Sequence, residues 1–82
     1  MYQQAAIQSP ILQWKLELPP EQIEASVLLA VAHYKTEHGH SPRRAWVNPK
    51  DFEDNITVEI TKQQQLTVTP RGGCPRGYLW VF

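Results

Sequence analysis

The side chains best suited to chemistry gather in one segment, EHGHSPRRAW, which covers residues 37–46. This segment holds two of the three histidines, and neutral histidine nitrogens are common zinc ligands. His33 and His38 are five residues apart, so on a helix they point in different directions. Only His38 and His40 could meet, and a zinc site needs three or four ligands, so another residue such as Cys74 would have to take part. The sequence therefore predicts no metal site, and we expect no cofactor.

The four arginines occupy only two segments of the chain. Arg43 and Arg44 follow the histidines, whereas Arg71 and Arg76 lie in a loop that contains three glycines. The planar guanidinium group suits phosphate and carboxylate, and glycines let backbone N–H groups approach an anion. The alternative is that the arginines keep the surface soluble and pair with nearby acids such as Asp51. If the two segments meet in the fold, they form a patch for nucleic acid or phosphate, made of His38, His40, Arg43, Arg44, Arg71 and Arg76.

Cys74 is the only cysteine of the chain, so an internal disulfide is excluded. A cysteine nucleophile needs a base within reach, and only His38 or His40 could serve. The surrounding loop, PRGGCPRG, lacks the lysine and the Ser/Thr that end a P-loop, and no helical pattern follows it. A chain of 82 residues also has little room for a deep pocket. We therefore expect no enzyme activity and assign no catalytic residue.

Eight basic side chains balance eight acidic ones, which gives a formal net charge of zero. This balance argues against a protein whose whole surface holds a polyanion, although a local basic patch stays open. No apolar run is long enough to span a membrane, and residues 1–7 lack the basic and apolar regions of a signal peptide, so we expect a cytoplasmic protein. The length fits one domain over residues 11–82, preceded by a flexible or loosely packed extension, residues 1–10.

Hydrophobic periodicity predicts a strand and then a helix in the first half of the chain. Apolar and polar residues alternate over 12–18, the period of a strand with one buried face. Two prolines end this strand, and apolar residues at spacings of three and four predict a helix over 20–38, with Gly39 as its C-terminal cap. Leu28 and Leu29 widen the apolar stripe, so we expect this helix to be covered on more than one side.

The second half of the chain has the patterns of four strands. Residues 44–47 form a short one, and alternation over 56–61 and 66–69 predicts a hairpin with a four-residue loop. The five apolar residues 78–82 predict a last strand that is covered on both faces. The fold class is therefore α+β: one amphipathic helix packed on a small, mostly antiparallel sheet of four to five strands, with the helix after the first strand.

One helix covers only one face of such a sheet. Trp46 has the opposite parity from its apolar neighbours, and the last strand alternates so that three aromatic residues share one face. Aromatic patches of this kind mark protein interfaces. We therefore expect a protein partner or self-association into a homo-oligomer, through Trp46, Tyr78, Trp80 and Phe82. The alternatives are nucleic-acid or anion binding by the arginine patch, and covering of the second face by the N-terminal extension.

Overall fold

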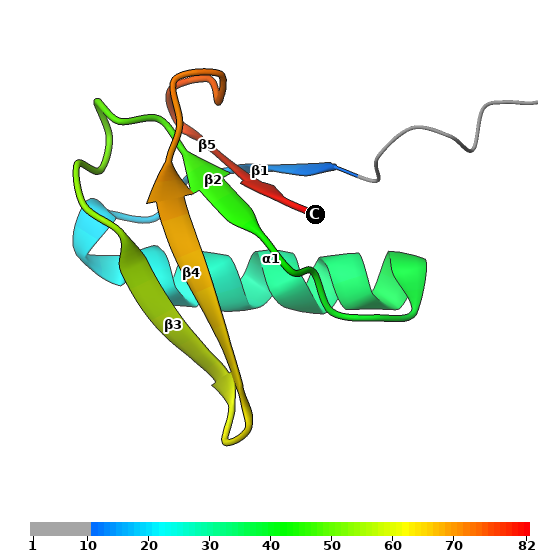
Figure 1. Cartoon of the computed structure of the whole chain (residues 1–82). Helices are drawn as coiled ribbons and strands as arrows, with labels where there is room; N and C mark the ends of the chain where they lie inside the picture. The colour runs from blue at the N-terminus through cyan, green and yellow to red at the C-terminus, as the bar shows by residue number, and fades with distance from the viewer. Residues whose placement is uncertain (1–10) are drawn as a thin grey trace, which may run out of the picture.

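Five strands form one mixed sheet in the computed structural model, which describes residues 11–82 (Figure 1). The strands are β1 (Leu12–Lys15), β2 (Ala45–Val47), β3 (Ile56–Thr61), β4 (Gln64–Pro70) and β5 (Tyr78–Val81). Their spatial order is β1-β5-β2-β4-β3, and all neighbours are antiparallel except β2 and β4, which are parallel. The predicted α+β fold is confirmed. The extension predicted for residues 1–10 lies outside the described residues.

The helical layer begins with a 3-10 turn, η2 (Pro20–Gln22), and continues as α1 (Ile23–His38). The helical segment therefore begins at residue 20, as predicted, but its first turn is a 3-10 helix rather than an α-helix. A residue before proline is held extended, and Pro19 has a ψ of 153°, so the first turn closes with the short bond from Gln22 N–H to the Pro19 carbonyl at 2.8 Å. The predicted end is confirmed: Gly39 has a φ of 79° and donates its N–H to Lys35.

Two strand boundaries differ from the prediction. β1 ends at Lys15 rather than at residue 18, because its partner β5 begins only at Tyr78; beyond it, the Leu16 N–H still donates to the Gly77 carbonyl at 2.9 Å. The β3–β4 hairpin turns over two residues, 62–63, and not over four. A bulge between Glu59 and Thr61 shifts the register there, and such a bulge adds the local twist that a tight turn needs.

The core lies between α1 and one face of the sheet. Val27, Ala30 and Tyr34 of the helix are at most 1% exposed and pack in one core with buried side chains of β2, β3, β4 and β5 and half-buried ones of β1. Leu28 and Leu29 are 39% and 53% exposed, so the expectation of a helix covered on several sides was wrong. The sheet lies on one side of α1 only, and within residues 11–82 no other helix or strand packs on the far side of the sheet (Figure 1). This far side is called the open face below.

Candidate functional site

Three aromatic side chains form a contact cluster on the open face. Trp46 of β2 lies directly opposite Trp80 of β5, and their ring centroids are 6.5 Å apart at an interplanar angle of 24°. Phe82 meets Trp46 edge-on, with centroids 4.9 Å apart. The indole N–H of Trp80 donates to Gln13 Oε1 on β1 at 2.9 Å. These three rings are called the aromatic cluster below.

Tyr78, the fourth residue predicted at this surface, also lies on the open face by strand alternation, opposite Lys15. All four aromatic residues are half-buried, because the rings and the neighbouring strands cover one another. The large apolar side chains that are most exposed in residues 11–82 lie elsewhere: Ile11, Leu18, Leu28 and Leu29. The open face is therefore a mixed aromatic and polar surface rather than a bare apolar one.

A polar hollow of about 440 Å³ lies over β2 and β4 beside the aromatic cluster. It is called the β2–β4 hollow below. The guanidinium carbon of Arg71 stands 5.8 Å from the centroid of the Trp46 ring, close enough for a cation–π contact. The lining has three arginines and no carboxylate, and it consists of Arg43, Arg44, Ala45, Trp46, Gln65, Thr67, Thr69 and Arg71.

Pairing of β2 with both neighbours explains how two distant segments meet here. The N–H groups of Arg43 and Arg44 both donate to the Phe82 carbonyl at 2.8 Å, which extends the β2–β5 ladder beyond β2. On the other side, the Arg71 N–H donates to the Val47 carbonyl at 2.8 Å, which holds the end of β4 beside β2. The parallel β2–β4 pairing thus brings three of the four arginines to one hollow.

A second hollow of about 740 Å³ adjoins the same arginine pair where the chain passes from α1 into β2. It is called the loop hollow below. None of the lining side chains is a carboxylate, and the lining comprises Tyr34, His40, Ser41, Arg43, Arg44, Gln64 and Phe82. The two hollows therefore flank Arg43 and Arg44, and together they make a cationic path that includes His40.

The three histidines lie in the C-terminal half of α1 and just after it, and the ring centroids of His38 and His40 are 6.4 Å apart. His33 Nε2 lies 3.1 Å from Glu37 Oε2, one helical turn away. His38 and His40 both contact the ring of Tyr34, with centroids 4.4 and 5.6 Å apart respectively. Of the two histidines predicted in the anion patch, only His40 lines a hollow with the arginines. Within residues 11–82 no three metal-ligating side chains come close enough to share an ion.

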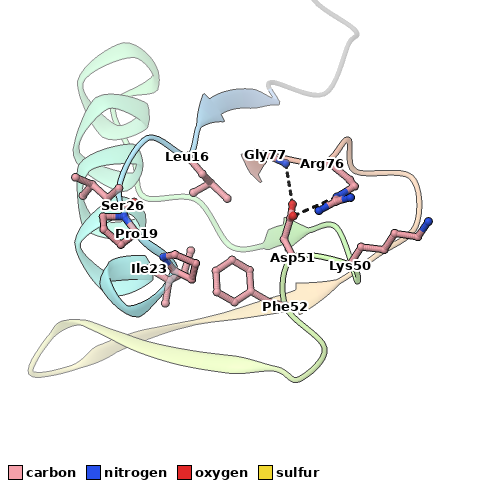
Figure 2. Close-up of a pocket in the computed structure, with 11 residues that line it drawn as sticks. Leu16, Pro19, Ile23, Ser26, Lys50, Asp51, Phe52, Arg76 and Gly77 are labelled. Atoms are coloured by element: carbon pink, nitrogen blue, oxygen red, sulfur yellow. Dashed lines mark hydrogen bonds and ion pairs between the residues drawn. The ribbon is translucent and has the colours of Figure 1, made fainter.

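Arg76 lies apart from the other arginines, although it shares a loop with Arg71. Its Nε is 3.4 Å from Asp51 Oδ1, and the same carboxylate accepts the Gly77 N–H at 2.7 Å (Figure 2). This pairing borders a different hollow, of about 370 Å³, with apolar walls that include Ile23 and Phe52 (Figure 2). The sequence-predicted patch is thus divided, with Arg76 paired to an acid.

Cys74 is buried and its thiol faces two backbone carbonyls. Its Sγ lies 3.5 Å from the carbonyl oxygens of both Trp46 and Tyr78. Burial raises the pKa of the Cys74 thiol above its ordinary value, and the negative charge of Asp51 acts in the same direction. Since the thiolate is the nucleophile, this environment favours the unreactive form.

Most carboxylates of the protein belong to elements away from the two cationic hollows, but Glu59 lies opposite Gln65, which lines the β2–β4 hollow. Six of the eight belong to η2, α1 and the β2–β3 loop: Glu21, Glu24, Glu37, Asp51, Glu53 and Asp54. Of the other two, Glu17 follows β1, and Glu59 on β3 lies opposite Gln65. A net charge of zero therefore coexists with a local positive surface around Arg43, Arg44 and Arg71.

The polar floor of the β2–β4 hollow was not predicted from the sequence. Thr67 and Thr69 share a face with Gln65 because strand residues alternate, and that alternation is readable in the sequence of β4. The sequence does not show that β4 pairs with β2. This pairing puts Thr67 and Thr69 on the same sheet face as Trp46.

Fold and site together define a small α+β domain with an open, cationic and aromatic sheet face. No described helix has both the length and the apolar composition to cross a membrane. A scan against protein-family models, a search of curated proteins and a search of solved structures each find no match to the chain.

Proposed function

We propose that this protein binds nucleic acid through the open face of its sheet. The observation that carries the proposal is the β2–β4 hollow, which Arg43, Arg44 and Arg71 line without any carboxylate. Arginine forks match the geometry of phosphate oxygens, and phosphate contacts supply most of the affinity for nucleic acid. Trp46 stands in the same hollow, where an aromatic face can stack on a base.

The zero net charge, which argued against this function at the level of composition, is compatible with it in the fold. Charges more than about one Debye length apart, roughly 8–10 Å at physiological salt, are largely screened from each other. The carboxylates of α1 lie on the opposite layer from the open face (Figure 1). A phosphate in the β2–β4 hollow therefore meets three lining arginines, against one carboxylate, Glu59, opposite the lining residue Gln65.

An amide NMR titration of labelled protein at low salt tests the proposal directly. A short mixed-sequence oligonucleotide is added, in one sample as a single strand and in another as a duplex. We expect shifts concentrated at residues 43–46 and 65–71, which added salt removes, and none over the first two turns of α1. A double variant, Arg43→Ala with Arg44→Ala, should shift much less at equal oligonucleotide concentration. If neither form of the oligonucleotide shifts these residues, the protein does not bind nucleic acid.

Binding of a protein partner or a second copy through the aromatic cluster is the second candidate. The half-buried rings of Trp46, Trp80 and Phe82 on an uncovered face support it. It ranks second because a two-fold interface puts the same patch of both copies together. Pairing the open face with itself would therefore bring two sets of three arginines together.

Sedimentation equilibrium distinguishes this candidate from the first. Self-association through the cluster predicts a dimer in the wild type and a monomer in a Trp80→Ala variant that keeps its fold by NMR. A wild-type protein that sediments as a monomer at all concentrations would refute self-association. The cytoplasmic location expected from the sequence stays a prediction.

A further inference from the structure

We infer that the nucleic acid held by the open face is single-stranded, an inference that rests on the proposed function. Stacking on a side chain requires a base with a free face, and inside a duplex both faces of each base are already stacked. The open face offers two indole rings, Trp46 and Trp80, with centroids 6.5 Å apart and planes only 24° from parallel. The stacked pair, with Arg71 over the Trp46 ring, forms one aromatic surface that suits the splayed bases of a single strand.

The spacing of the arginines along the sheet fits the same strand. Arg44 immediately precedes β2, and the bond from Arg71 to the Val47 carbonyl sets Arg71 level with the position after Val47. These positions are four residues apart along β2, or about 13 Å at roughly 3.3 Å per residue. Each nucleotide advances a strand by about 3.4 Å along the axis of a duplex, and about 13 Å therefore spans more than one nucleotide. Arg44 and Arg71 therefore hold different phosphates, and the nucleotide between them lies beside Trp46.

The floor of the β2–β4 hollow can read the edges of an unpaired base. The hydroxyl groups of Thr67 and Thr69 and the amide of Gln65 line the hollow, and they supply both hydrogen-bond donors and acceptors. In a duplex the Watson–Crick edges are occupied by the partner strand, so these groups would face only the phosphate backbone or a groove.

The elements that could enter the groove of a duplex are poorly charged for that task. A major groove admits an α-helix or a two-stranded ribbon. α1 lies on the other side of the sheet and carries Glu24 and Glu37. The β3–β4 hairpin carries Glu59 and has one cation, Lys62, in its turn. Three of the four arginines lie instead in the hollow that Trp46 also lines.

Competition binding with the full chain tests this inference. A fluorescent single-stranded oligonucleotide of mixed sequence is bound at low salt and displaced by the unlabelled strand, by its annealed duplex, or by polyglutamate. We expect the single strand to compete at least about tenfold better than the duplex, because one stacked base contributes about that factor in affinity. Polyglutamate, which has charge but no bases, should compete more weakly still.

Two variants with the same added charge locate the strand. Thr67 is exposed and lines the β2–β4 hollow, so Thr67→Glu should weaken single-strand binding at least about fivefold by repelling phosphate a few Å away. Ala25 is exposed on α1, and Ala25→Glu should leave the affinity unchanged. Both changes replace exposed side chains, and thermal unfolding checks that both proteins are folded.

The outcomes distinguish failure of the single-strand inference from failure of nucleic-acid binding itself. A duplex that competes as well as the single strand would overturn the inference and leave nucleic-acid binding intact. Equal competition by polyglutamate would replace nucleic acid with an acidic protein segment as the partner. Equal affinity of the Thr67→Glu and Ala25→Glu proteins would remove the strand from this hollow. If the labelled oligonucleotide does not bind at all, the proposed function itself fails.

Discussion

Replacing Arg71 with alanine should lower the salt dependence of oligonucleotide binding by about one third. Arg71 lines the β2–β4 hollow with Arg43 and Arg44. If each arginine contacts one phosphate, the logarithm of the binding constant falls with the logarithm of salt concentration with a slope of about −2.1, because each single-strand contact contributes about −0.7. Without Arg71 the slope becomes about −1.4. Over a fourfold rise in salt, the wild type then loses about 18-fold in affinity and the variant about 7-fold.

Arg76 provides the matched control, because it is the other arginine of the same loop. Its side chain is 65% exposed and pairs with Asp51 away from the aromatic cluster. Asp51 is only 17% exposed, but it keeps the bond from the Gly77 N–H without Arg76, and the largely solvated Arg76 contributes only about 1 kcal/mol, so Arg76→Ala should fold normally. Fluorescence anisotropy of a labelled single strand at four salt concentrations gives the slope for each protein. An unchanged slope in Arg71→Ala, or an equal reduction in Arg76→Ala, would refute the placement of the phosphates.

Three further predictions concern stability and the buried thiol. Leu79→Ala removes a fully buried side chain and should lower the free energy of unfolding by about 2–5 kcal/mol, whereas Leu29→Ala, at a position 53% exposed, should cost less than about 1 kcal/mol; urea unfolding compares them. Gly39→Ala meets no atom but forces alanine to a φ of 79°, so it should cost about 1–2 kcal/mol, while Gly72→Ala, which has free space and no such φ, should be close to neutral; equal melting temperatures for the two variants would contradict the left-handed cap. Because folding raises the pKa of Cys74 above the ordinary 9.0, the contribution of this thiol to stability is complete below about pH 9 and is lost as the pH rises through the folded value. A Cys74→Ala variant should lack that loss, and parallel stability curves for the two proteins between about pH 8 and 10.5 would show the shift to be absent.

Much of the site could be predicted because its determinants are local. Alternation put Trp46 on the face opposite Ala45 and Val47, and the burial of the two small residues agrees with this. It also put Trp80 on the same side of β5 as Tyr78, and both are half-buried while their neighbours are fully buried. A period of two depends only on the pleat of the strand itself, so it can be read without knowing the neighbours.

Strand ends and turns were less predictable because they depend on the partner strand. β1 ends opposite the first residue of β5, although its own alternation continues to residue 18. The hairpin turn is shorter than expected because a bulge at 59–61 absorbs the change in register. Residues 62–65 alone do not show where the hairpin turn lies, and the residues of β1 alone do not show where that strand ends.

The sequence by itself determined the inventory: one capped helix, five short strands, two arginine segments and an aromatic set on one parity. Only the tertiary structure decided which of these meet. The order β1-β5-β2-β4-β3 puts β2 between β5 and β4, so Trp46 has Trp80 on one side and Arg71 on the other. The same packing sends Arg76, five residues further along, to Asp51. Periodicity and capping are local and act within a few residues, whereas strand order follows from how the whole chain buries its apolar faces, which no single segment specifies.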